Sequence, residues 1–143
     1  MLQPGAGPGA IDAVTSGAIT HNQESWIEIT WDIATPGEVR FLWDVSSERN
    51  YDFGEVYIDG VRVGFASGTA SWTEQRFPLA PGTRTVRWRY VKDGSTNTGQ
   101  DRFRIAGVRL ELPTLCSIEG CEVGVYNGGD CSFCPPVDPL CVD

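Results

Sequence analysis

Cysteine is missing from most of this chain: no cysteine precedes Cys116, although the 143 residues include five. The long segment before Cys116 therefore has to fold by burying apolar side chains. The chain's five tryptophans, six phenylalanines and four tyrosines are enough for one sizeable core. From Cys116 onward the sequence is rich in Gly, Pro and Cys and poor in large apolar residues, so this part needs covalent or metal cross-links instead.

Basic residues are also scarce, with 11 Lys and Arg against 19 Asp and Glu and a formal net charge of −8. Nucleic-acid-binding proteins concentrate Lys and Arg to contact phosphates, so nucleic acid is not an expected partner. No apolar run approaches the ~18 residues that a transmembrane helix needs, so no membrane span is expected. Met1–Ala13 lacks the basic and apolar regions of a signal peptide, so an exported form would be a mature fragment with an added Met or a piece of a longer chain.

The usual signatures of catalysis are missing as well. The single histidine, His21, lies in a polar stretch, Thr20–Gln23, with no serine or cysteine motif around it. The sequence has no nucleophile elbow, no phosphate-binding loop and no histidine-rich metal set. Paired carboxylates for glycoside hydrolysis can be recognised only by their separation in space. We therefore expect a protein that is not an enzyme.

The chain does have a period of two in its apolar residues. In Trp26–Asp32, Val39–Val45 and Val86–Val91, apolar side chains alternate with polar ones. Such alternation predicts strands with one face on a core and the other on solvent, as in antiparallel sheets. Turn signals separate the runs, and no helix-period segment is longer than a turn. About seven to nine short strands without a helix predict an all-β fold, an antiparallel β-sandwich.

Two local features can be predicted within this sandwich. Asp59-Gly60 separates two short apolar runs, and this dipeptide tolerates the positive φ of a two-residue hairpin turn. The last strand should cover Phe103–Leu112, where Gly107 interrupts the alternation and predicts a β-bulge.

Composition divides the chain into three parts. Residues 1–15 are rich in Gly and Pro without periodicity, and should form an arm or linker that either packs along another subunit or stays free. Residues 16–113 should form the sandwich. Residues 114–143 should form a short, loop-rich tail that is stapled by its cysteines.

Several segments are more specific than a generic sandwich. They are Ser46–Asp52 (SSERNYD), Tyr57–Gly60 (YIDG), Trp72, Pro81–Tyr90 (PGTRTVRWRY) and Lys92–Gly94 (KDG). In this order they resemble a jelly-roll module of secreted and surface proteins of bacteria, similar in plan to the MAM-type and gingipain cleaved-adhesin domains. The resemblance covers Ser16–Leu112, does not reach the cysteine tail, and implies a jelly roll. A fold by itself does not determine function.

The chain departs from that module at two positions. Ala106 stands where the final strand usually carries an aspartate, so any role of that carboxylate is absent. Arg84 stands just before the predicted strand Val86–Val91, at a position where the module commonly has a histidine.

Carboxylates and amides gather at two predicted loops, one after a strand end and one before the final strand. The candidate metal ligands are Glu48, Asp52, Asp93, Asn97 and Asp101. Hard oxygen ligands on adjacent loops would suit Ca²⁺, which takes six to eight oxygens, and the resemblance adds that cleaved-adhesin domains look calcium-stabilised. The alternative is that Asp93 and Asp101 cap turns and pair with Arg or with Lys92.

The aromatic residues divide into two groups. Trp43, Trp88 and Tyr90 fit the inward phase of their strands and should belong to the core. A second group lies nearer to loops and is positioned to stack on a sugar or on a partner protein. The candidate ligand-binding residues of this group are Tyr51, Trp72 and Tyr126.

The cysteines have the spacing C-x4-C-x9-C-x2-C-x6-C, and they are Cys116, Cys121, Cys131, Cys134 and Cys141. Zinc is an unlikely occupant, because a zinc ribbon usually has two Cys-x-x-Cys pairs and only one is present. We expect two intrachain disulfides, with one cysteine left to pair elsewhere. Disulfides persist in oxidising compartments, so an extracellular or cell-surface location is expected.

Two functions fit these observations. The first is a non-catalytic recognition or adhesion module, with calcium as an optional stabiliser, whose loops bind a glycan or a surface protein. The second is a structural subunit of an extracellular filament or surface layer, in which the arm and the odd cysteine join neighbouring copies into a homo-oligomer or a larger assembly.

Overall fold

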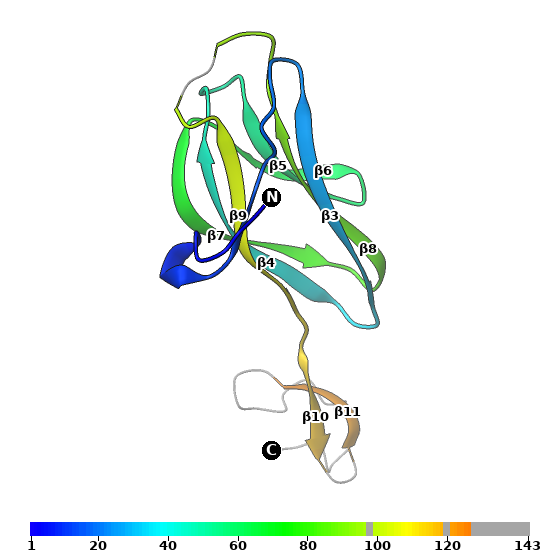
Figure 1. Cartoon of the computed structure of the whole chain (residues 1–143). Coiled ribbons are helices and arrows are strands. Elements are labelled where there is room, and N and C mark those ends of the chain that lie inside the picture. Colours follow the sequence, from blue (N-terminus) through cyan, green and yellow to red (C-terminus); the bar gives the residue numbers. More distant parts are fainter. Residues whose placement is uncertain (97–98, 119–120, 127–143) are drawn as a thin grey trace.

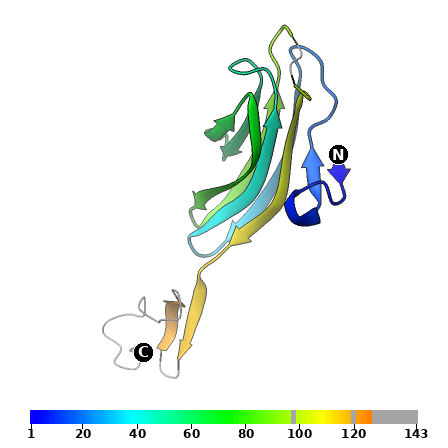
Figure 2. The ribbon, with the colours of Figure 1, turned by 90° about the vertical axis from the view of Figure 1, so that its left-hand side faces the viewer.

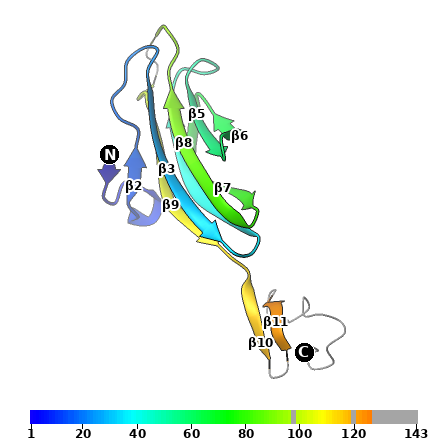
Figure 3. The same cartoon turned by 90° about the vertical axis from the view of Figure 1, so that its right-hand side faces the viewer.

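A computed structural model of the chain describes residues 1–96, 99–118 and 121–126, and for 114–118 and 121–126 it describes the backbone alone. Up to Glu111 the chain forms two antiparallel sheets stacked as layers, as Figure 1 and the two side views in Figures 2 and 3 show. The described part of the chain contains no helix with the length and apolarity needed to span a bilayer.

The strand order is that of a jelly roll. The first sheet has the order β1-β2-β9-β4-β7, with bounds Leu2–Gln3, Ala13–Thr15, Arg102–Glu111, Gly37–Ser46 and Thr69–Leu79. The second has the order β3-β8-β5-β6, with bounds Glu24–Ile33, Gly82–Val91, Phe53–Ile58 and Val61–Ala66. Strands β2 to β9 form two four-stranded sheets of orders 2-9-4-7 and 3-8-5-6, the double Greek key of that fold. The predicted all-β sandwich is confirmed.

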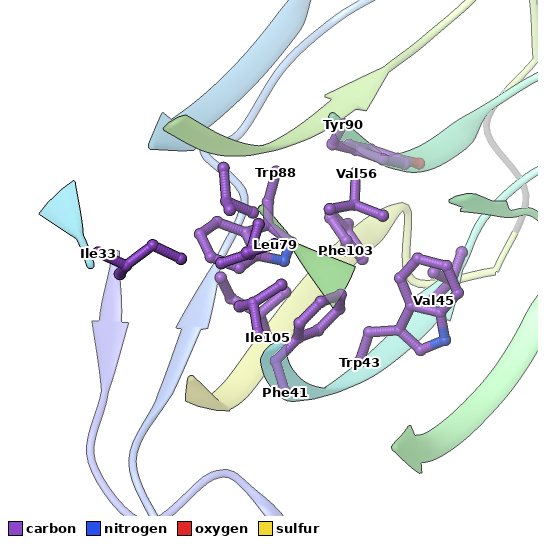
Figure 4. Packing of buried hydrophobic residues seen from close by; sticks show 12 residues of the cluster. Ile33, Phe41, Trp43, Val45, Val56, Leu79, Trp88, Tyr90, Phe103 and Ile105 are labelled. Atoms are coloured by element: carbon purple, nitrogen blue, oxygen red, sulfur yellow. The ribbon is translucent and has the colours of Figure 1, made fainter. Parts of the chain in front are cut away.

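The core lies between the sheets, where the inward residues of the alternating runs meet (Figure 4). Trp43, Trp88 and Tyr90 are buried, as predicted. The Phe41 ring packs edge-on against Trp88, with 5.3 Å between the centroids. β3 follows the predicted alternation but is an edge strand, so Ile27 on its inward phase stays exposed.

Both predicted backbone features are present. Asp59 and Gly60 join β5 to β6 with φ of +50° and +81°, the left-handed conformations of a two-residue hairpin turn. Gly107 has φ of +60°, and the register between β9 and β4 shifts between Arg40 and Leu42, which marks the β-bulge.

The N-terminal arm is part of the sheet. β2 pairs with β9, where Ala13 lies opposite Ala106, and β1 pairs with β2. Between them the arm makes one 3₁₀ turn, Pro8–Ala10. A Cβ at Gly7 would lie 3.1 Å from the Cβ of Ala106. The arm therefore covers Ala106, and a small residue fits there.

Beyond β9 the chain continues into a hairpin of β10 (Thr114–Ile118) and β11 (Cys121–Tyr126), seen below the sandwich in Figure 1. The side chains of Cys116, Cys121 and Tyr126 belong to the part described by its backbone alone. The other predicted disulfide residues, Cys131, Cys134 and Cys141, lie outside the described residues. The predicted pairing of the cysteines stays a prediction.

Candidate functional site

Three loops meet at one end of the sandwich, at the top of Figure 1. They are the turn before β3, the loop between β4 and β5, and the loop between β8 and β9. The backbone N–H of Asn22 donates to the carbonyl of Asp93 (2.8 Å), and the N–H of Asp93 donates to Oδ1 of Asp52 (2.9 Å). Backbone and side-chain hydrogen bonds thus fix the loops against one another.

Three of the predicted metal ligands converge at this end. One carboxylate oxygen each from Glu48, Asp52 and Asp93 lies within 4.8 Å of the other two. Asp52 is fully buried, and Glu48 and Asp93 are half-buried. Oδ2 of Asp52 and Oε2 of Glu48 are buried and have no hydrogen-bond partner among the described residues. Buried acceptors without a donor are costly. Oδ2 of Asp52 has the ammonium of Lys92 at 3.7 Å, and Oε2 of Glu48 calls for a cation or a donor at this place.

The carboxylates also repel one another. Burial, followed by the charges of Asp93 and Asp52, raises the pKa of Glu48 above its usual range, against a smaller opposing effect of Lys92 and His21. A glutamate whose charged form is disfavoured in this way becomes a good ligand once a divalent cation offsets the repulsion.

Asp101, the fourth predicted ligand in the described part of the chain, lies in an ion pair. Its carboxylate binds the ammonium of Lys92, whose side chain is fully buried, and accepts a hydrogen bond from the Tyr90 hydroxyl (2.8 Å). Burial and this bond to Asp101 raise the pKa of Tyr90 well above its usual range. Lys92 also lies 3.7 Å from Oδ2 of Asp52. Asp101 therefore follows the alternative of pairing with Lys92, and Asn97 lies outside the described residues.

The burial of Lys92 was not predicted from the sequence, although the alternation of the strand before it indicates an inward position. Val86, Trp88 and Tyr90 alternate into the core, and Lys92 continues the same phase. A lysine at an inward position needs carboxylate partners, and Asp52 and Asp101 supply them.

The predicted aromatic residues have different surroundings. Tyr51 is 57% exposed and directly precedes Asp52, and its backbone N–H donates to the carbonyl of Glu48 (3.3 Å). Trp72 belongs to β7 in the other sheet, where the guanidinium of Arg104 stacks on its ring at 4.9 Å. Tyr51 therefore lies in the loop of Glu48 and Asp52 and Trp72 lies on β7, and the side chain of Tyr126 is outside the described part of the chain.

A scan of known protein families finds no match to the chain, and no curated protein matches it. Among solved structures, the secreted serine protease VesC from Vibrio cholerae matches 69% of the chain and 21% of the protease, at 20% identity and a TM-score of 0.52. The chain thus spans about a fifth of that protein. At this identity the likeness shows the fold alone.

Two carbohydrate-binding modules are similar more loosely. A family 35 module from an environmental isolate matches 77% of the chain and 96% of the module, at 16% identity and a TM-score of 0.40. The CBM36-1 domain of a multidomain xylanase from the hindgut metagenome of Trinervitermes trinervoides matches 75% and 86%, at 16% identity and a TM-score of 0.38. Likenesses this loose carry no inference about the chain. The resemblance to the MAM-type and cleaved-adhesin domains stays a prediction.

Proposed function

We propose that the chain is a non-catalytic recognition module, extracellular or on a cell surface, whose calcium-ordered loops bind a glycan. One observation carries this proposal: carboxylate oxygens of Glu48, Asp52 and Asp93 converge, two of them buried without a hydrogen-bond partner among the described residues, and the loop that carries Glu48 and Asp52 also carries the exposed Tyr51. A surface protein remains the second kind of ligand that such loops can recognise.

The donor set suits calcium. All three side chains offer hard oxygen ligands, and Ca²⁺ accepts irregular geometry and completes its shell with carbonyls and water. When bound, the ion would supply two positive charges to a cluster that has three carboxylates facing one another and a single buried ammonium, Lys92.

The residues of the loop would then determine recognition. Glu48 and Asp52 stand on either side of Tyr51, so holding their carboxylates in place also fixes the backbone that carries this ring. A fixed aromatic ring loses less conformational entropy when a sugar stacks on it, and preorganisation of this kind raises affinity.

The test is calorimetric titration of Ca²⁺ and thermal unfolding with and without EDTA, followed by screening on a glycan array. At free calcium one hundred times Kd, binding should stabilise the fold by about 2.7 kcal/mol and raise Tm by several degrees. Asp52→Asn should abolish the shift, and Glu74→Gln, an exposed carboxylate of the other sheet, should retain it. Tyr51→Ala should keep calcium binding and weaken glycan binding; a variant that binds glycans as tightly as the wild type would contradict the proposal.

The structural-subunit alternative is supported by the N-terminal arm. β2 is held by three register pairs with β9, and a chain of eight residues connects it to β3 in the opposite sheet, from 16 to 23. A short arm strand on such a connection can pair with β9 of a neighbouring copy, which would link copies through exchanged arms.

A further inference from the structure

The outer face of the β3-β8-β5-β6 sheet carries a regular pattern of charged and aromatic side chains (Figure 3 shows these strands side by side). One row crosses all four strands: Trp26 on β3 lies opposite Arg89, Arg89 opposite Glu55, and Glu55 opposite Phe65 on β6. Trp26 and Phe65 are 50% and 56% exposed. An exposed aromatic ring thus stands at each edge of the sheet, about 14 Å apart across three inter-strand spacings.

The next row has charged residues at both edges of the sheet. Glu28 lies opposite Arg87, Arg87 opposite Tyr57, and Tyr57 opposite Arg62. Arg87 donates twice to Oε2 of Glu28, at 3.0 and 2.9 Å, and its guanidinium lies 4.2 Å from the centroid of the Trp26 ring. The two rows are therefore connected, and the exposed tryptophan is held by an arginine that is itself held by a carboxylate.

Every arginine of this face has a carboxylate partner. Arg89 binds Glu24 and Glu55, and Arg62 binds the other oxygen of Glu55 at 2.9 Å. Arg84 binds Asp59 at 2.8 Å beside the hairpin turn. On the outer face, Arg62, Arg87 and Arg89 thus pair with Glu24, Glu28 and Glu55, whereas Arg84 reaches Asp59 from the inward phase of β8.

The face is also hollowed. Between β3 and the tip of the β5–β6 hairpin lies a depression of about 480 Å³, whose lining includes Glu24, Glu28, Asp59, Arg87 and Arg89. Its volume is in the range of small-molecule sites. Its walls present fixed donors and acceptors in alternation, together with the Tyr57 ring.

We propose that this face binds a neutral oligosaccharide laid across the strands, with sugar rings stacked on Trp26 or Phe65 and hydroxyl groups held by the arginine–carboxylate pairs. A sugar presents apolar C–H faces to aromatic rings, and hydroxyls that both donate and accept. The inference rests on the proposed function for its ligand class, but it assigns a second site on a different surface, one that needs no calcium.

The balance of charges decides which glycans fit. A uronate or sulfated chain would have to displace or face the carboxylates of Glu24, Glu28 and Asp59, and the arginines beside them, Arg87 and Arg89, are already paired. A neutral chain can bond to both partners of the Arg87–Glu28 and Arg89–Glu24 pairs without breaking them. The length of the row, from one sheet edge to the other, favours several linked rings over a single sugar.

The experiment titrates the whole chain, in EDTA, with cellohexaose, xylohexaose, mannohexaose and laminarihexaose, and with a galacturonate oligomer as the anionic probe. Calorimetry gives Kd, and the tryptophan indole N–H signals in ¹⁵N spectra locate the site. At least one neutral probe should bind and should move the Trp26 signal. Trp26→Ala should weaken binding about tenfold, the loss expected for a single stacked aromatic ring. Leu112→Ala, an exposed apolar residue outside this face, should bind like the wild type.

Three results would overturn the inference: binding of the galacturonate alone, no binding of any neutral probe, or neutral binding that leaves the Trp26 signal and the Trp26→Ala affinity unchanged. Since all titrations are done in EDTA, they do not depend on the loop site. Calcium-dependent glycan binding that is lost in Tyr51→Ala would uphold the proposed function even where this second site fails.

Discussion

At the scale of single residues, the most demanding feature is the buried amine of Lys92. Its side chain is fully buried, as is that of Asp52, and Asp101 completes the group at the loop end of the core. Burying a charge is tolerable only when it is paired, so each member of this group depends on the others.

Lys92→Met tests that dependence. The substitution keeps the length of the side chain but leaves Asp52 buried without its cation, so we expect a loss of about 3–5 kcal/mol in the free energy of unfolding, measured by urea denaturation in EDTA. Arg109→Met is the matched control, because it removes the half-exposed pairs with Glu74 and Glu111 and should cost less than about 1 kcal/mol. Equal losses in the two variants would show that Lys92 is not held as described.

Glu48 makes the stability of the protein depend on pH in a direction that calcium reverses. Its pKa is raised in the folded state above the ordinary value of 4.5, so the folded chain retains a proton that the unfolded chain has released. The stability linked to this proton is present below pH 4.5 and is lost as the pH rises through the raised pKa.

We therefore expect the Tm of Glu48→Gln to rise relative to the Tm of the wild type when the pH is raised from 4 to 7 in EDTA. In saturating calcium the order should invert at neutral pH, because the wild type binds the ion through its ionised carboxylate and the variant lacks that ligand. Parallel Tm curves for the two proteins under both conditions would refute the assignment of Glu48 to the cluster.

At the scale of elements, the N-terminal arm has two possible pairings, within one chain or between two copies. Ala13 and Ala106 are opposite each other on β2 and β9 and are both buried. Directly opposed residues of antiparallel strands have Cα separations that a disulfide can bridge.

The double variant Ala13→Cys, Ala106→Cys distinguishes the two pairings. Oxidation should link the two positions within a single chain if the arm folds back as described, and peptide mapping by mass spectrometry should find this bridge in the monomer band. Ala13→Cys alone is the control for pairing with the native cysteines. Covalent dimers joined through positions 13 and 106 would instead favour arm exchange and the structural-subunit function.

Most strands were predictable because their signal is local. The alternation in β3, β4 and β8 requires only a few residues of sequence, and Asp59-Gly60 determines its turn by itself. The strands of the arm were not recognised because β1 and β2 have two and three residues, too few to show a period, among glycines and prolines. Loop contacts such as Glu48 with Asp93 depend on the closure of the whole sandwich, so the sequence could suggest this group but could not show that its members meet.

At the scale of the whole molecule, charge is unevenly distributed. Segment 114–143 contains five acidic residues and no basic one, which leaves 14 acidic and 11 basic residues in 1–113. Most of the net charge of −8 thus belongs to the tail. One bound calcium ion would bring the sandwich close to neutrality, so its net charge would neither strongly attract nor strongly repel a charged partner.

The path of the chain out of the sandwich also has a mechanical consequence. β9 leads through two residues, Leu112 and Pro113, into β10, and within the sheet it lies between β2 and β4. Tension applied to the tail would run along the axis of β9, across hydrogen bonds that lie perpendicular to the strand on both sides. These bonds would share the load and would have to shear together instead of opening one after another. If the protein is anchored through its tail, a pulling force such as fluid flow would load these hydrogen bonds in shear, the geometry in which they break together.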